Sequence, residues 1–115
     1  MDTVLFILKI IAGVGTVGTG LLALFRPTSI YDFTGLQATG GRGITEIRAI
    51  FGALFIALGA VVLVYRSKET FMMLGITYLA IALVRVISMF LDQSIERSNI
   101  ISTVVEIVFG VILVL

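Results

Sequence analysis

The stretch Phe71–Leu91, FMMLGITYLAIALVRVISMFL, decides the fold of this chain. It is apolar apart from a few small polar side chains and a single charged residue, Arg85. A helix that crosses the hydrocarbon core of a bilayer needs about 20 residues, with a lower limit of about 17. The stretch is long enough, so it predicts a membrane-spanning helix that carries an ionisable residue inside the membrane.

Three further apolar runs have the same character. They are Val4–Phe25, Ala49–Tyr65 and Ile100–Leu115. The only charged residue of the first run is Lys9, and the only charged residue of the last run is Glu106. We expect the aliphatic chain of Lys9 to extend along the helix so that its ammonium lies at the membrane surface. The second and fourth runs are short, so their helices are expected to include the preceding residues 44–50 and 95–99 as well. The sequence therefore predicts four spans.

Composition excludes several classes of protein. The chain is 59% hydrophobic and 13% charged, which cannot supply the polar surface of a soluble domain. The run that contains Lys9 is longer than is typical of a removable signal peptide, although Gly18, Gly20 and Ala23 could mimic a cleavage site. The net charge of +1 lacks the excess of basic residues that is typical of nucleic-acid-binding proteins. Cysteine and histidine are both absent, so disulfides, haem, zinc and iron–sulfur sites are not expected. No cofactor and no metal site is predicted.

The predicted fold class is all-α: an integral membrane four-helix bundle of antiparallel, up-down topology that forms a single domain over residues 1–115. The predicted helices cover about 3–25, 44–65, 70–92 and 97–115, and a long connection covers 26–43. An even number of spans puts both termini on the same side of the membrane, called side A. The opposite side B carries the long connection and the turn near 92–99. Arginines near the membrane ends favour a cytoplasmic side B, unless Arg42 and Arg48 serve a site.

Small residues recur at four-residue spacing on the first two predicted helices. The stripes are Ala12, Thr16 and Gly20; Gly15, Thr19 and Ala23; and Ala49, Ala53 and Ala57, flanked by Gly52 and Gly59. Such stripes let helix backbones approach closely in lipid. They favour packing within the bundle and leave open a homo-oligomer built through the same stripes.

Arg85 and Glu106 are predicted to meet. Inserting a charged side chain at the depth of the hydrocarbon core costs at least about 2.5–3.5 kcal/mol. Such a residue is therefore expected to pair with an opposite charge or to serve a function. Asp92 and Asn99 lie on either side of the predicted turn, and the two charged residues lie equally far from that turn. In an antiparallel pair they would share one depth, where the planar guanidinium could grip the carboxylate at two points.

Further charges are expected on the same side of the membrane. Arg85, Ser88 and Asp92 recur on one helical face. Glu46 and Arg48 lie in the first turns of the second span, and Arg48 is expected to face the bundle interior. The predicted ligand-binding residues are therefore Glu46, Arg48, Arg85, Asp92 and Glu106, with no catalytic residue and no metal ligand among them.

A family resemblance supports these residues. The resemblance rests on the run Gly43–Leu54, GITEIRAIFGAL, together with Arg85, Asp92 and Glu106. The pattern resembles a bacterial family of small four-helix integral membrane proteins catalogued as a domain of unknown function. The family pattern has the motif G-x-x-E-I-R-A-x-Y-G-G at the start of the second span, an arginine followed by Asp-Gly in the third and a glutamate in the fourth. The chain departs from it at Phe51, which replaces the tyrosine, and at Ala53 and Gln93, which replace glycines. The resemblance implies a bacterial inner membrane location and the candidate residues, and it implies no activity.

Three functions remain open at this point. The first is binding or transport of a small anionic, zwitterionic or lipid-like ligand by the polar cluster. The second is a structural or accessory membrane subunit in which the Arg85–Glu106 pair only fixes helix packing. The third is a lipid-modifying enzyme with Glu106 as general base and Ser88 as a distant nucleophile. The enzyme is the least favoured, because neither histidine nor cysteine is present to support it.

Overall fold

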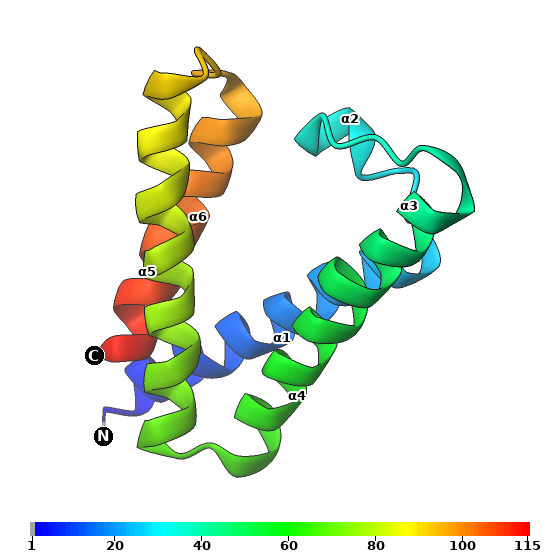
Figure 1. Ribbon diagram of the computed structural model, residues 1–115. Coiled ribbons are helices and arrows are strands. Elements are labelled where there is room, and N and C mark those ends of the chain that lie inside the picture. Colours follow the sequence, from blue (N-terminus) through cyan, green and yellow to red (C-terminus); the bar gives the residue numbers. More distant parts are fainter. Residues whose placement is uncertain (1) are drawn as a thin grey trace. The chain divides into compact units, whose positions relative to one another are not determined.

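The computed structural model describes residues 2–115, and every regular element in this part of the chain is a helix (Figure 1). Four helical segments are long and apolar enough to cross a membrane: Thr3–Phe25, Gly40–Tyr65, Lys68–Leu91 and Arg97–Val114. The prediction of four such segments is confirmed. Their length and composition indicate a membrane protein.

The elements follow one another with short connections. They are α1 (Thr3–Phe25), α2 (Tyr31–Thr34), α3 (Gly40–Glu46), η1 (Ile47–Ala53), α4 (Leu54–Tyr65), α5 (Lys68–Leu91) and α6 (Arg97–Val114). The second long segment begins at Gly40, earlier than the start near residue 44 that the sequence indicated. An ion pair between Arg42 and Glu46 joins successive turns there, and Thr45 Oγ1 donates to the Gly41 carbonyl at 3.0 Å. These contacts extend the helix into a glycine-rich stretch that sequence alone indicated as loop.

The second long segment contains a π-helix, η1, between α3 and α4. At its end the Leu54 N–H donates to the Ala49 carbonyl, five residues earlier, in place of the usual spacing of four. A π-helix of this kind is rare and is often found at functional sites. The hydrophobic pattern of the sequence gives no sign of it.

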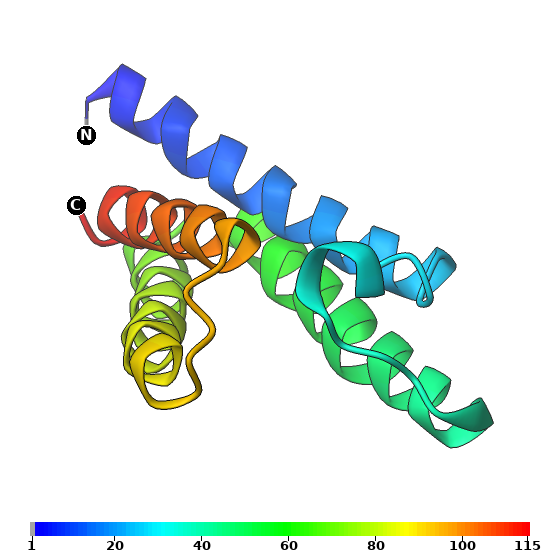
Figure 2. The same cartoon turned by 90° about the horizontal axis from the view of Figure 1, so that it is seen from above.

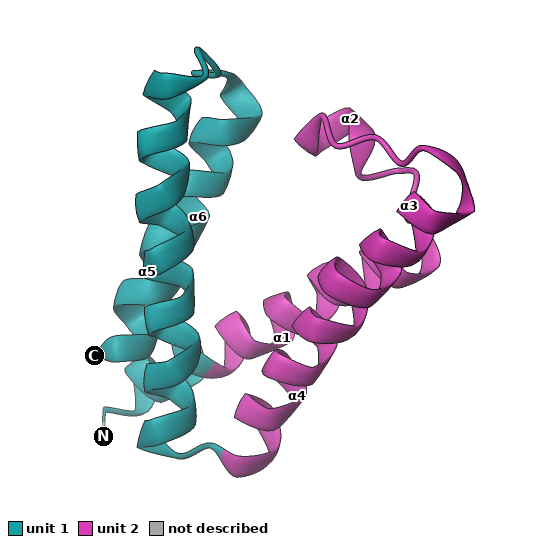
Figure 3. Ribbon diagram, viewed as in Figure 1, with its two compact units in different colours: residues 1–9, 66–115 teal, residues 10–65 magenta. Residues whose placement is uncertain are grey.

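The chain divides into two compact units (Figure 3). Unit 1 consists of the residues up to Lys9 together with Arg66–Leu115, and unit 2 consists of Ile10–Tyr65. Unit 1 thus holds the first turns of α1 with α5 and α6. Unit 2 holds the rest of α1 with α2, α3, η1 and α4.

In unit 1, α5 and α6 lie side by side (Figures 1 and 2). Ser67 begins α5 with a capping box, in which its hydroxyl accepts from the Thr70 N–H at 3.2 Å. The two helices approach closely at Gly75, where an added Cβ would lie 3.0 Å from the Gly110 carbonyl oxygen and 2.8 Å from Leu113 Cβ. This contact leaves no room for a side chain, so glycine sets the spacing of the helix pair.

The start of α1 packs on the start of α5 within unit 1. Phe71 is fully buried, and the Phe6 ring meets it edge to face at a centroid distance of 6.2 Å. The Lys9 ammonium lies 5.1 Å from the centroid of the Phe71 ring, and Lys9 is only 3% exposed. The side chain is therefore covered by protein, which differs from the expected extension to the membrane surface. The face of an aromatic ring attracts the cation and accounts for this position.

In unit 2, α1 packs against η1 and α4 through glycines. An added Cβ at Gly20 would lie 2.7 Å from the Gly52 carbonyl oxygen, and one at Gly59 would lie 2.8 Å from the Gly13 carbonyl oxygen. Glycines of the predicted stripes are thus used for packing within the chain. Ala49, Ala53 and Ala57 remain exposed on the same segment. The homo-oligomer stays a prediction.

Candidate functional site

The centre of the candidate site is the contact between Arg85 on α5 and Glu106 on α6. Arg85 Nε donates to Glu106 Oε1 at 2.9 Å, and Arg85 Nη2 donates to Glu106 Oε2 at 2.9 Å. The arginine side chain is 32% exposed and the glutamate side chain 11% exposed. This is the bidentate contact that the sequence predicted for these residues, and it joins α5 to α6.

Asn99 extends this contact toward the turn between the helices. Arg85 Nη1 donates to Asn99 Oδ1 at 3.0 Å, and Asn99 Nδ2 donates to the Ser94 carbonyl at 2.8 Å. Sequence reasoning used Asn99 only to locate the turn and missed it as a partner of Arg85. The signal was available, because Asn99 and Glu106 are seven residues apart and therefore lie on one face of α6.

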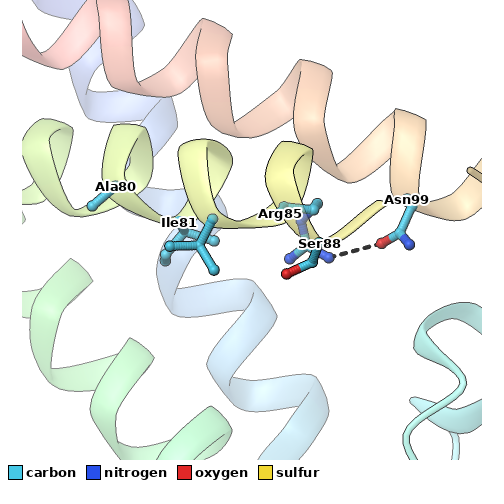
Figure 4. A pocket seen from close by; sticks show the side chains of 6 residues that line it. Ala80, Ile81, Arg85, Ser88 and Asn99 are labelled. Atoms are coloured by element: carbon cyan, nitrogen blue, oxygen red, sulfur yellow. Dashed lines mark hydrogen bonds between the residues drawn. The ribbon is translucent and has the colours of Figure 1, made fainter. Parts of the chain in front are cut away.

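An open hollow of about 520 Å³ lies beside this network. Its lining residues are Ala80, Ile81, Val84, Arg85, Ser88 and Asn99. Figure 4 shows Arg85 and Ser88 together on α5, with the dashed bond from Arg85 to Asn99 and with Ala80 and Ile81 farther along the same helix. The hollow therefore brings a predicted site residue, Arg85, to a space that a ligand could occupy.

The lining of the hollow changes character along α5. Ala80, Ile81 and Val84 make one end apolar, whereas Ser88 and Asn99 make the end near the turn polar. At a rise of about 1.5 Å per residue, the lining spans about 12 Å from Ala80 to Ser88. A space with one polar end and one apolar end matches an amphipathic molecule.

The guanidinium of Arg85 has more N–H donors than the hydrogen bonds described above use. A guanidinium carries five N–H groups, and the described side chains accept three of them, from Nε, Nη1 and Nη2. One N–H on Nη1 and one on Nη2 are left without an acceptor among these hydrogen bonds. The side chain is about one third exposed and lines the hollow, so a ligand there could accept from these N–H groups.

Asp92 lies just beyond the end of α5. It is exposed, its backbone N–H donates to the Ser88 carbonyl at 2.8 Å, and its carboxylate forms no ion pair within residues 2–115. Its spacing places it on the same helical face as Arg85 and Ser88. Asp92 is therefore an unpaired negative charge one helical turn beyond Ser88, outside the residues that line the hollow.

The other two predicted site residues lie in unit 2. Arg48 Nε donates to the Leu24 carbonyl at 3.1 Å, which is one of the last carbonyls of α1 and has no partner within that helix. Arg48 therefore caps α1, and a cation is also favoured there by the helix dipole. Glu46 pairs with Arg42, and both side chains are largely exposed. The structure thus gives Arg48 and Glu46 contacts within unit 2, and Arg85 and Glu106 contacts within unit 1.

Polar groups of the described chain are well satisfied. No buried side-chain nitrogen or oxygen in residues 2–115 lacks a hydrogen-bond partner, and Thr103 Oγ1 adds a bond to the Asn99 carbonyl at 2.8 Å. Within the same residues, no group of three His, Cys, Asp or Glu side chains is placed to hold a metal ion. The arrangement therefore consists of one charged pair whose arginine lines a hollow.

Comparison with known proteins identifies the family. No curated protein and no solved structure matched the chain. One family model, described as "Domain of unknown function (DUF4345)", matches residues 4–115, which include every helix of both units except the first residue of α1. The chain therefore belongs to the DUF4345 family.

Proposed function

We propose that this membrane protein binds a small amphipathic, lipid-like molecule in the hollow beside Arg85. The polar head, anionic or zwitterionic, would accept hydrogen bonds from Arg85 and contact Ser88 and Asn99. The apolar part would lie along Ala80, Ile81 and Val84. One observation carries the proposal: the lining changes from apolar to polar along α5 and ends at a cation with unused donors.

Energetics support a head group at Arg85. A hydrogen bond to a charged group contributes about 1.5–3 kcal/mol, more than a neutral one. Glu106 holds the guanidinium in a fixed orientation, so little conformational entropy is lost when a ligand binds. The apolar walls add contact area for a hydrocarbon chain. Glu106 is thus a positioning residue, whereas Arg85 would touch the ligand.

The finer arrangement is part of the same proposal. We place the chain in the bacterial inner membrane as an up-down bundle with both termini on side A. Four spans joined by the short connections at 66–67 and 92–96 support this topology. Participation of Glu46 and Arg48 in the binding site stays a prediction, as does movement of the ligand across the membrane.

A structural or accessory role is the second candidate function. It is favoured by the completeness of the Arg85–Glu106 contact, which satisfies both carboxylate oxygens at 2.9 Å. In this role the pair would fix the register of α5 against α6 for a partner protein. The hollow would then be filled only by lipid chains without selection.

Native mass spectrometry of the detergent-extracted protein tests the first candidate. Wild type should retain a bound lipid or metabolite, and Arg85→Gln should lose it. Arg97→Gln, an exposed arginine at the start of α6, serves as the matched control and should retain the ligand. Equal retention by Arg85→Gln would remove the hollow as the binding site, and a bare wild-type protein would favour the structural role.

A further inference from the structure

We infer that the head group bound in the hollow is zwitterionic, with a phosphate at Arg85 and an ammonium at Asp92. This inference rests on the proposed function and narrows it to one chemical class, a phospholipid-type head with an amine. It uses Asp92, which the Arg85–Glu106 network does not engage.

Charge at the polar end of the hollow argues against an anion alone. Arg85 and Glu106 form an ion pair and together carry no net charge. A ligand with one net negative charge would add to the negative charge of Asp92, which lies one helical turn beyond Ser88 on the same face. A zwitterion adds no net charge, offers its ammonium to Asp92 and still offers acceptor oxygens to the unused N–H groups of Arg85.

Asp92 supplies the counter-charge for the amine. Its carboxylate is exposed and forms no ion pair within the described chain, and Ser88 lies on the same face between it and Arg85. The Ser88 hydroxyl can donate to a phosphate oxygen or accept from an ammonium. The order along α5 is therefore cation, hydroxyl and anion, which is complementary to a phosphate followed by an amine.

The spacing of the two charges fits a short head group. The guanidinium of Arg85 bonds both to Glu106 and to Asn99, which lies two turns closer to the start of α6. The guanidinium thus reaches toward the turn, and we place it about one helical turn, or about 5 Å, from the level of Asp92. A two-carbon linker between phosphate and ammonium bridges a gap of this size.

The test measures lipid preference. Purified full-length protein in detergent is mixed with equal amounts of phosphatidylethanolamine and phosphatidylglycerol, and bound lipids are counted by native mass spectrometry. Wild type should favour phosphatidylethanolamine by about fivefold, the size expected of one partly exposed charge contact. Asp92→Asn should abolish the preference, and Glu96→Gln, an exposed acid in the same turn, should keep it.

The outcomes separate this inference from the proposed function. Equal binding of both lipids by wild type, or a preference for phosphatidylglycerol, would overturn the zwitterion. The binding site would still stand in that case if Arg85→Gln lost both lipids. If Asp92→Asn kept the preference of wild type, Asp92 would not contact the head group and the inference would fail. Asp92 is exposed and caps α5 only through its backbone, so Asp92→Asn is expected to fold.

Discussion

Arginines in the two units have different partners. In unit 1, Arg85 is gripped by the Glu106 carboxylate through two hydrogen bonds. In unit 2, Arg48 donates from Nε to a backbone carbonyl at the end of α1 and its side chain stays exposed. The first contact joins two full charges that are partly buried, and the second joins a charge to a helix end.

This difference distinguishes Arg85, which belongs to a candidate binding site, from Arg48, which caps a helix. Arg48 ends a helix, which is a common structural task for a cation. Arg85 keeps two N–H groups free beside a hollow, although a carboxylate already compensates its charge. Two arginines of the same predicted cluster thus differ in their partners: Arg48 bonds to a helix end, and Arg85 lines a hollow that a ligand could occupy.

The largest expected effect lies in the charged pair. Arg85→Gln and Glu106→Gln should each lower the free energy of unfolding by about 2–3 kcal/mol, because each leaves one charge without its partner. The double variant should be less destabilised than the sum of the two, as measured by denaturant titration in micelles. Additive effects would show that the contact does not hold α5 against α6.

The glycine contact in unit 2 should show the next largest effect. Gly20→Ala places a Cβ 2.7 Å from the Gly52 carbonyl oxygen, so α1 and η1 must separate. We expect a loss of about 1–3 kcal/mol in the free energy of unfolding. Gly18→Ala is the control in the same helix, because no atom lies within 4 Å of its added Cβ. Gly18→Ala should be neutral or slightly stabilising, because alanine has a higher helix propensity than glycine. A comparable loss in both variants would contradict the close approach as its cause.

Arg48→Gln should have a smaller effect than Arg85→Gln. It removes one hydrogen bond and one charge at the end of α1, which corresponds to about 0.5–1 kcal/mol in the same titration. Arg48→Lys should recover part of this loss, because a lysine keeps the favourable charge. A loss as large as that of Arg85→Gln would mean that Arg48 has a stronger partner than a helix end and would remove the contrast between the units.

Arg42→Ala should have the smallest effect. Arg42 and Glu46 form an ion pair one turn apart, and their side chains are 78% and 54% exposed. Pairs of this kind contribute about 0.3–0.5 kcal/mol. The thermal midpoint in detergent should therefore stay close to that of wild type, and a large shift would show that α3 contributes more to unit 2 than its exposure indicates.

The sequence predicted the long helices and the charged pair for physical reasons that are local. Apolar runs of membrane length are visible without any tertiary information, as in Phe71–Leu91. A short turn forces the following helix back along the first, so Arg85 and Glu106 could be matched by their distances from that turn. Asn99 could have been found by the same argument, since it shares a face of α6 with Glu106.

Other features depend on contacts that are distant in sequence. The π-helix η1 forms in a segment whose hydrophobic pattern is continuous with α4, and the bond from Arg48 to Leu24 spans two helices. The burial of Lys9 against Phe71 likewise requires α1 to meet α5. The hollow exists only because Val84, Arg85 and Asn99 come together from two helices. None of these follows from spacing within one segment.

The most direct test of a ligand in the hollow fills that space and leaves the charged pair in place. Native mass spectrometry should show that Ala80→Phe loses the lipid that wild type retains, because the larger side chain occupies the apolar end of the hollow. Ala57→Phe, an exposed alanine on α4, should retain it. Undiminished retention by Ala80→Phe would contradict binding in the hollow and leave the Arg85–Glu106 contact with a structural role alone.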